Sequence, residues 1–426
     1  MEKLMQYIWQ HRLWQPVDMK TCAGTHVRII DPGKLNTGSG PDFFNAKIKI
    51  GDQMWAGDVE IHVRASDWHR HNHHTDPAYD SVILHVVAKD DMPIKRSDGN
   101  IIPQMKMDCS PNFRARYDSL VNLADRDLPC RQEISVMEPL HLHSWIDSLA
   151  YERLYQKSER IRRYLDHFSG DWESTCYTAL ARALGFGINS EPFERLAMSL
   201  PLKFIGKHSD SQLSIEALLF GQAGFLDNIE NPDTYTSLLK QEYDFLAHKF
   251  SLTKPSSLGW KTARMRPPNF PHRRIAFLAA ILFGGFKLMS KILDTRSVDD
   301  LPRLFNVEFT GYWANHYTFS GATEKPVTAA LSSSSISVLA INVVIPLMHA
   351  YSISTDNREL TALSVGLLQE LKPESNTIIS LFNAGGIQCP DAWTSQALIQ
   401  LRREYCETKK CIYCRIGHRM LSKCAK

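Results

Sequence analysis

Two hydrophobic patterns divide the chain at about residue 130. Before that point, short runs of β-branched and aromatic residues are separated by turn sequences such as Asp31-Pro32-Gly33. Apolar and polar residues alternate in Lys47-Ile48-Lys49-Ile50, which predicts a strand with one face in water. The Gly51-Asp52 pair after it predicts a tight hairpin. We expect five strands, at His26–Ile30, Phe43–Ile50, Met54–Arg64, Ser81–Ala88 and Ile101–Met107.

Helical periodicity dominates the rest of the chain and also marks the amphipathic segment 1–15. The expected later helices are Tyr151–Phe168, Thr175–Leu184, Glu191–Leu200, Ile215–Phe220, Pro232–Phe250, Arg274–Leu288, Asp356–Leu371 and Trp393–Tyr405. The fold class is therefore α+β, with an α/β domain followed by a mostly α-helical region. We expect three domains: 1–130, α/β; 131–385, helical; and 386–426, a Cys-rich segment packed on the helical domain.

Composition adds few constraints on function. Hydrophobic residues make up 43% and charged residues 22% of the 426 positions, as in ordinary globular proteins. The net charge of +3 is too small to predict nucleic-acid binding by itself. The apolar stretch Val338–Ala350 is short for a membrane span and contains Asn342 and Pro346. We therefore expect a soluble, cytoplasmic protein with no membrane partner.

Two acidic residues are expected to meet beside the predicted hairpin. Asp42 lies nine residues before Gly51 and Glu60 nine residues after it, so the arms are equal. Glu60 and His62 are two apart on a strand and point to the same face. Such a group suits Mg²⁺ or Mn²⁺, which can activate water against a phosphodiester. The alternative is a strand face in water and an Asp42 that only caps a turn.

The sequence Pro41-Asp42, followed after an intervening strand by Glu60-x-His62, resembles the PD-(D/E)XK phosphodiesterases. The resemblance covers roughly residues 1–110 and implies a restriction-endonuclease-like fold that begins with a helix. It implies that Asp42 and Glu60 are catalytic metal ligands and that His62 occupies the position of the family's lysine. A histidine there could orient or deprotonate water, or bind the metal. The acid on the family's first helix would be Glu2, and Gln104-x-Lys106 is an alternative to the Glu60-x-His62 pair.

A histidine-rich run follows these residues, at positions 68–76. In an extended conformation, His69, His71 and His73 would share one face, and His85 interrupts an apolar strand. Imidazoles at this density favour a transition metal such as Zn²⁺, Mn²⁺ or Fe²⁺. The alternatives are an exposed polar loop for the run and a hydrogen-bonded core histidine for His85. The ligands expected at the N-terminal site are Asp42, Glu60, His69, His71 and His85.

A basic cluster occupies segment 261–275 and precedes a predicted helix. Guanidinium groups at a helix start suit phosphate contacts, so DNA or RNA is the expected partner. The alternative is a structural loop whose arginines pair with acids elsewhere. The residues expected to bind nucleic acid are Arg264, Arg266, His272, Arg273 and Arg274.

Five of the nine cysteines fall in the last 38 residues, which favours a metal site in a reducing compartment. Cys406, Cys411 and Cys414 form a compact set. Cys389 is the favoured fourth ligand, and Cys424 is the alternative. Four thiolates would bind Zn²⁺ or a [4Fe–4S] cluster.

These features favour a metal-dependent nuclease or a nuclease-like nucleic-acid-binding protein. One alternative is a non-nuclease transition-metal protein that uses the His69–His74 cluster. Another is a catalytically inactive nucleic-acid-binding or scaffold protein. The strings GPDFFNAKIKI and GDVEIHVRASDWHRHNHHTDPAYDSVILHVV are also similar to a bacterial family, a domain of unknown function of about this length. That resemblance covers most of the chain, including the Cys-rich end, and implies no particular activity.

Overall fold

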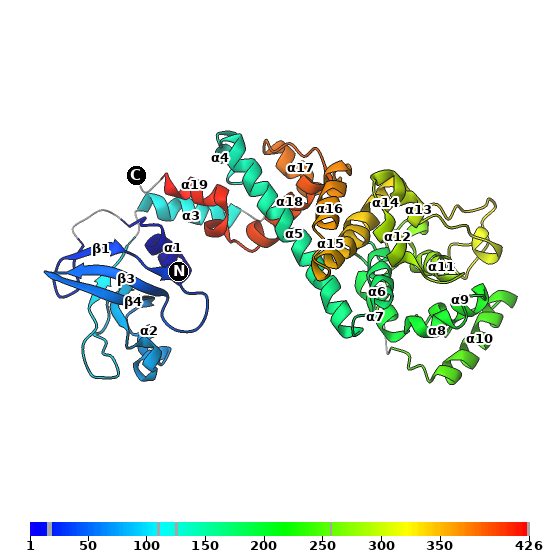
Figure 1. The fold of residues 1–426 in the computed structure, drawn as a ribbon, viewed down its shortest axis with the longest axis horizontal. Coiled ribbons are helices and arrows are strands. Elements are labelled where there is room, and N and C mark those ends of the chain that lie inside the picture. The colour runs from blue at the N-terminus through cyan, green and yellow to red at the C-terminus, as the bar shows by residue number, and fades with distance from the viewer. Residues whose placement is uncertain (15–18, 109–110, 124–126, 256–257, 424–426) are drawn as a thin grey trace. The chain divides into compact units, whose positions relative to one another are not determined.

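A computed structural model describes residues 1–14, 19–108, 111–123, 127–255 and 258–423 (Figure 1). The chain forms two compact units. Unit 1 comprises Met1–Trp145, Ser380–Ile387 and Leu401–Lys426, and unit 2 comprises Ile146–Ile379 and Gln388–Gln400. The sequence suggests three consecutive domains, whereas the Cys-rich end belongs here to the same unit as the N-terminal strands.

Among the described residues, six strands form one mixed sheet in unit 1. Its order is β1-β3-β4-β5-β6, with β2 paired to β3; β3 is antiparallel to its neighbours, whereas β4, β5 and β6 are parallel. The elements of this unit are α1 (Glu2–Gln10), β1 (Val27–Asp31), β2 (Lys34–Leu35), β3 (Phe43–Ile50), β4 (Gln53–Arg64), α2 (Asp67–Arg70), η1 (His73–Thr75), η2 (Pro77–Tyr79), β5 (Val82–Lys89), β6 (Gln104–Lys106), α3 (Pro111–Leu123), α4 (Arg131–Ser135), η7 (Leu401–Cys406), η8 (Cys411–Tyr413) and α19 (Arg415–Ser422).

The two faces of the sheet bury different kinds of residues. On one face, Val59 and Ile61 of β4 join a large apolar core that includes Ile8 of α1 and Leu421 of α19. On the other face, the intervening residues of β4 are polar but equally buried. This alternation is that of a strand covered on both sides, and it confines the polar side chains to a separate layer.

A β-bulge sets the alignment of the two acidic positions. Ile50 pairs with Gln53 across the predicted two-residue turn. The register then shifts between Ala46 and Phe43, so that Phe43 pairs with Val59. Asn45 lies within this shift and has a left-handed φ of 57°. The backbone amide of Asn45 donates to the Asp58 carboxylate at 3.0 Å. Bulges of this kind redirect side chains, and this one aligns the start of β3 with the polar part of β4.

The bulge gives a stability prediction with a matched control. Asn45→Val places a β-branched residue in the left-handed region and is expected to lower the free energy of unfolding by about 1–2 kcal/mol. Asn45→Gly is expected to change it by less than about 1 kcal/mol, because glycine adopts this φ freely. Urea denaturation of both variants checks the difference. Equal stability of the two would show that the left-handed φ is not required.

Unit 2 is helical, and each helix expected in it is present, although the one expected at Tyr151 begins at Pro139. Segment 274–288, expected as one helix, ends at Leu282, where Phe283 is extended and precedes Gly284 and Gly285 with φ values of 76° and 98°. The helices Leu202–Gly206 and Leu288–Asp294 and the stretch Ser333–Ser354 were not expected. The elements are α6 (Trp172–Leu184), α7 (Ser190–Ser199), α8 (Leu202–Gly206), α9 (Gln212–Gln222), α10 (Thr234–Phe250), α11 (Pro271–Leu282), α12 (Leu288–Asp294), α13 (Leu301–Leu304), α14 (Ser333–Leu339), η6 (Ala340–Val344), α15 (Ile345–Ser354), α16 (Arg358–Glu370) and α18 (Ala392–Gln400). Two further helices, α5 (Pro139–His167) and α17 (Thr377–Ala384), have residues in both units.

One helical stretch of unit 2 is notably apolar. Ser333–Ser354, which combines α14, η6 and α15, is long and apolar enough to cross a membrane, although 67% of its most apolar window is buried within the structure. Such burial is also typical of a core helix in a soluble protein. Among the described residues it is the one helix that meets these criteria of length and composition.

Candidate metal centre

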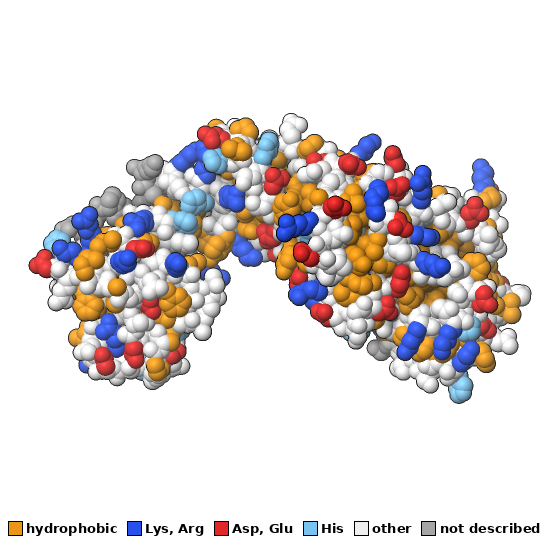
Figure 2. Space-filling view, in the orientation of Figure 1, with side chains coloured by type: hydrophobic (Ala, Val, Ile, Leu, Met, Phe, Trp, Pro, Cys, Tyr) orange, Lys and Arg blue, Asp and Glu red, His pale blue; other side chains and the backbone are white. Residues whose placement is uncertain are grey.

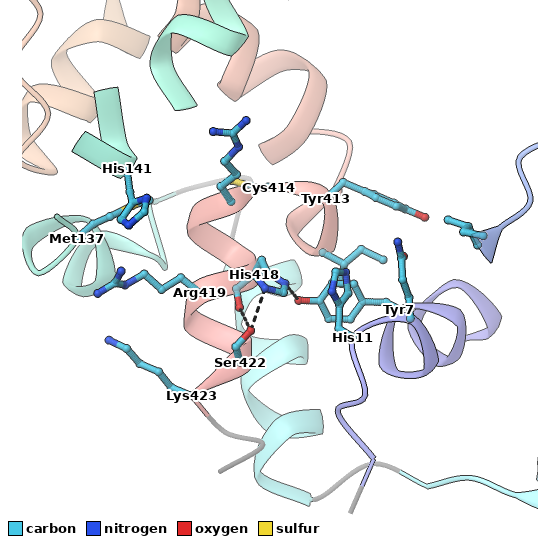
Figure 3. Close-up of a pocket in the computed structure, with 14 residues that line it drawn as sticks. Tyr7, His11, Met137, His141, Tyr413, Cys414, His418, Arg419, Ser422 and Lys423 are labelled. Carbon is cyan, nitrogen blue, oxygen red and sulfur yellow. Dashed lines mark hydrogen bonds between the residues drawn. The ribbon is translucent and has the colours of Figure 1, made fainter. Parts of the chain in front are cut away.

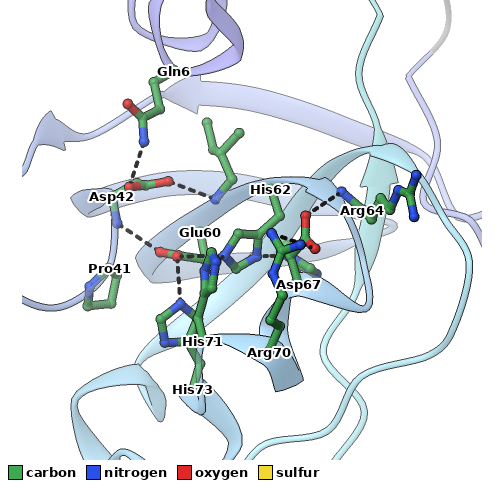
Figure 4. Close-up of polar contacts among 12 residues, drawn as sticks. Gln6, Pro41, Asp42, Glu60, His62, Arg64, Asp67, Arg70, His71 and His73 are labelled. Atoms are coloured by element: carbon green, nitrogen blue, oxygen red, sulfur yellow. Dashed lines mark hydrogen bonds and ion pairs between the residues drawn. The ribbon is translucent and has the colours of Figure 1, made fainter. Parts of the chain in front are cut away.

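The carboxylates of Asp42 and Glu60 come together at the start of β3. The backbone amide of Asp42 donates to Glu60 Oε2 at 3.0 Å, and the amide of Ile61 donates to Asp42 Oδ2 at 3.0 Å. Gln6 of α1 donates to Asp42 Oδ1 at 2.8 Å (Figure 4). The hairpin, together with the register shift at Asn45, therefore brings the two acids together through contacts with the neighbouring backbone.

A cluster of imidazoles lies on the other side of Glu60. Its Oε1 atom is 3.4 Å from His62 Nε2 and 3.2 Å from His73 Nε2 (Figure 4). His62 Nε2 also lies 3.1 Å from His71 Nδ1, and His62 Nδ1 lies 2.9 Å from His85 Nε2. Glu60 thus lies between Asp42 and a group of four histidines, of which it contacts His62 and His73 directly.

The fold of the histidine-rich run decides which imidazoles reach this cluster. The run is not extended: α2 begins at Asp67, whose carboxylate accepts the Arg64 amide at 3.1 Å, and Asn72 then adopts a left-handed φ of 62°. This turn brings the rings of His71 and His73 against His62; His73 is half-buried there, whereas His71 is exposed. His69 is placed elsewhere, and its ring packs against His74 with centroids 4.7 Å apart.

Trp68 holds this segment against the sheet. Its side chain is fully buried, with its ring edge against His73 at 5.4 Å and the ring of His85 also at 5.4 Å. Tyr79 stacks on His73 with centroids 3.7 Å apart. The imidazoles are therefore fixed by aromatic packing as well as by polar contacts.

Burial shifts Asp42, Glu60, His62, His73 and His85 toward their neutral forms. It raises the pKa of Asp42 to about 7, with repulsion from Glu60 adding to the effect, and it raises the pKa of Glu60 to about 8. Burial and neighbouring histidines lower the pKa of His62 to about 2, and burial lowers that of His85 to about 3. A bound cation would reverse the balance by favouring ionised carboxylates and neutral imidazoles.

The donor set fits a borderline transition metal. One ligand nitrogen from each of His62, His71 and His73 lies within 4.8 Å of the other two, the one such group among the described residues. Glu60 adds a carboxylate oxygen, and Nδ1 of His85 is buried with no partner. Imidazoles with carboxylate suit Mn²⁺, Fe²⁺ or Zn²⁺ better than Mg²⁺, which prefers oxygen ligands.

Of the five N-terminal ligands expected from the sequence, the structure brings together Asp42, Glu60, His71 and His85. His73 is the residue that the expected set lacks. The alternation of histidines at 69, 71 and 73 indicated that His73 could be a ligand. An extended conformation would have placed His69 on the same face, and His69 was the one included in the expected set.

The basic cluster of segment 261–275 is divided between surface and interior. Arg264 and Arg266 are exposed. Arg273 is buried and donates to the carbonyls of Trp313, His316, Val327 and Thr328. Arg274 is also buried and donates to Asn269, while His272 packs against Phe225. On the face drawn in Figure 2, Lys and Arg side chains of unit 2 are interspersed with Asp and Glu.

The cysteines of the C-terminal segment fall in different units. Cys406, Cys411 and Cys414 belong to unit 1, whereas Cys389 belongs to unit 2, where its thiol contacts the Asp391 carbonyl at 3.8 Å. Cys424 lies outside the described residues. Cys130, which sequence reasoning did not select, lies in unit 1 beside the three tail cysteines.

Unit 1 also contains an open pocket of about 750 Å³ between α1 and α19 (Figure 3). Its lining includes His11, His418, Arg419 and Lys423. Glu133 pairs with Arg419 at 2.7 Å and with Lys423 at 2.9 Å, so two of these cations are already neutralised.

Fold and site together define an α+β protein whose mixed sheet carries a buried carboxylate–histidine cluster. The chain belongs to the family described as protein of unknown function DUF2851, whose family model matches residues 2–377. The match includes the whole cluster and Cys130 but ends before the Cys-rich segment. No curated protein and no solved structure matches the chain.

Proposed function

We propose that this protein is a metal-dependent phosphodiesterase that acts on DNA or RNA. The observation that carries the proposal is the position of Glu60, between Asp42 on one side and the imidazoles of His62 and His73 on the other. Two acids beside neutral nitrogen ligands provide both the charge and the donor atoms that a divalent metal requires.

The arrangement of elements supports the PD-(D/E)XK resemblance. Helix α1 comes first, Asp42 precedes β3 directly, and Glu60 lies on the adjoining strand β4. Gln6 contacts Asp42 from α1, the helix on which the resemblance suggests a further acidic group. These features favour a restriction-endonuclease-like core for unit 1.

The departure at His62 defines the expected chemistry. A bound divalent metal would lower the pKa of a coordinated water and stabilise charge on the phosphoryl group. Asp42 and Glu60 would hold the metal, and Gln6 would orient Asp42. His62 is only 1% exposed and is tied to His71 and His85, so it serves better as a ligand than as a mobile cation in place of lysine. We therefore favour Mn²⁺ over Mg²⁺.

The test compares two acids at opposite ends of the same strand, β3. Plasmid and single-stranded DNA are incubated with Mn²⁺ and one of three proteins: the wild type, the Asp42→Asn variant or the Asp52→Asn variant. Asp52 is exposed in the hairpin turn and serves as the control. We expect cleavage by wild type and Asp52→Asn, and at least about a 100-fold loss in Asp42→Asn, as for groups acting directly in catalysis. No cleavage by wild type, or equal cleavage by all three, would defeat the proposal.

A second candidate is a transition-metal protein that does not cleave phosphodiesters. The three mutually close imidazoles of His62, His71 and His73 favour it. It predicts stoichiometric Zn²⁺, Fe²⁺ or Mn²⁺ that survives dialysis, in a protein with no nuclease activity. DNA affinity without cleavage and without bound metal would instead indicate an inactive binding protein.

A further inference from the structure

Four thiols line one cavity in unit 1. Cys130, just before α4, faces Cys406 at the end of η7 and Cys411 and Cys414 at the two ends of η8. The volume of this cavity is small, about 20 Å³. Apolar side chains, including Leu120 and Leu128, complete the wall.

The thiols are close enough to influence one another. Burial raises the pKa of Cys130 to about 12, with the thiols of Cys414 and Cys411 adding to the effect. Burial also raises the pKa of Cys406, and the other three cysteines contribute to that shift. None of the four forms a disulfide. Four free thiols that share one cavity form a donor set for a soft metal centre.

Local packing holds the thiols in place. Gly417 of α19 lies so close to Cys411 that a Cβ atom there would be 2.2 Å from the Cys411 carbonyl oxygen. Glycine is therefore required at this position for α19 to approach η8. Cys414 directly precedes α19, and the amides of Gly417 and Ile416 donate to its sulfur, which lowers its pKa against the effect of burial. Amide donors to sulfur are typical of cysteines that bind metal clusters.

A further donor lies beside Cys414. The indole N–H of Trp145 is buried, has no oxygen or nitrogen acceptor, and interacts as a donor with the Cys414 thiol, which favours ionisation of that thiol. A buried donor needs an acceptor. An anionic thiolate at Cys414 would provide a strong one.

The spacing of the sulfur atoms distinguishes a cluster from a single ion. Zn–S bonds of about 2.3 Å place the thiolates of a tetrahedral site about 4 Å apart. Among the described residues, no three cysteine sulfurs lie mutually within 4.8 Å. The four thiols line one cavity at a wider spacing than this, as ligands at the corners of a larger inorganic core do.

We propose that Cys130, Cys406, Cys411 and Cys414 bind a [4Fe–4S] cluster. The site differs from the one suggested by the sequence, because Cys130 replaces Cys389. Binding converts the four thiols to thiolates and releases their protons. The cluster would link α4 to the C-terminal segment and so fix α19, whose His418 and Arg419 line the open pocket of unit 1.

The test measures iron, acid-labile sulfide and zinc in the full chain, purified without oxygen and reconstituted with iron and sulfide. We expect about four irons and four sulfides per chain, with the broad visible absorption of a thiolate-ligated cluster. Cys130→Ser is expected to lose most of both. Cys389→Ser is the matched control and is expected to keep them.

Alkylation of the unmutated protein gives a readout that does not depend on how the variants fold. Iodoacetamide labelling with mass spectrometry should show the four cysteines protected together and labelled together after chelation of iron. Cys22, which is exposed, should label in both states. Absence of iron and sulfide from the wild type, or zinc in their place, would overturn the proposal. Equal losses in Cys389→Ser and Cys130→Ser, or labelling of Cys130 while the cluster is bound, would overturn the ligand assignment.

Discussion

Changing Glu60 to glutamine is expected to lower the affinity for Mn²⁺ by at least about 100-fold, since even changes behind the direct ligands of a metal cost about 10–100-fold. Glutamine keeps the shape of the side chain but removes its charge. Glu60 Oε1 contacts both His62 and His73, so the substitution also removes the acceptor that orients both rings. Isothermal titration calorimetry with Mn²⁺ measures the change.

Two histidine variants show whether the geometry, rather than charge alone, explains this loss. His73→Asn is expected to weaken Mn²⁺ binding by about tenfold or more, because His73 contacts Glu60 directly. His69→Asn should leave binding unchanged, because that ring packs against His74 instead. If His69→Asn weakened binding as much as His73→Asn, the run would bind metal in a conformation other than this one.

Without metal, the free energy of unfolding is expected to fall as the pH rises from about 6.5 to about 8. Asp42 and Glu60 have pKa values of about 7 and about 8 in the folded protein, above their usual 3.8 and 4.5. The folded state therefore binds protons that the unfolded chain has released. Stability from these two groups is complete below pH 4 and is lost as pH rises through the folded pKa values, by about 1.4 kcal/mol per pH unit for each proton.

Three histidines of the cluster act in the opposite direction and over another range. The pKa values of His62, His73 and His85 lie below the usual 6.5, so their contribution is present above pH 6.5 and is lost as the pH falls. Between about pH 4.5 and 6.5 the two effects oppose each other, and above 6.5 only the carboxyl effect remains. Mn²⁺ should reverse this loss of stability at high pH. At a concentration of 100 times its Kd, it should raise the free energy of unfolding at pH 8 by about 2.7 kcal/mol.

Chemical denaturation at pH 6.5 and pH 8, with and without Mn²⁺, checks this prediction. The double variant Asp42→Asn/Glu60→Gln is the control, because it removes both titrations while keeping the size of the side chains. Its stability should change less between the two pH values than that of the wild type. A wild type as stable at pH 8 as at pH 6.5, without metal, would contradict the raised pKa values.

Local patterns were sufficient to predict the strands other than β2 and the proximity of the two acids. The alternation in Phe43–Ile50 and the Gly51-Asp52 turn correctly predicted the hairpin and the approach of Asp42 to Glu60, although the alignment of the two acids depends on the bulge. The mixed α+β fold follows from the change of periodicity near residue 130. The bulge at Asn45 could not be predicted, because its left-handed backbone leaves no distinctive residue pattern.

Features that depend on tertiary contacts were not accessible in the same way. The approach of His71 and His73 to His62 depends on where α2 begins and ends, at Asp67 and before Asn72, rather than on the histidines themselves. The buried state of Arg273 depends on distant carbonyls. Cys130 could not be identified as a candidate ligand from the sequence, because it lies far from the other cysteines in the chain and only the fold brings it beside them.

The division of unit 1 between both ends of the chain has a consequence for how the protein is made. On the ribosome, the N-terminal sheet and Cys130 emerge well before residues 401–423, which are translated only after all of unit 2. The apolar core that Ile412 and Leu421 complete, and the cavity lined by four thiols, must therefore stay unfinished throughout most of translation. During this interval the unfinished unit 1 is the part of the nascent chain most in need of a chaperone and of protection from oxidation.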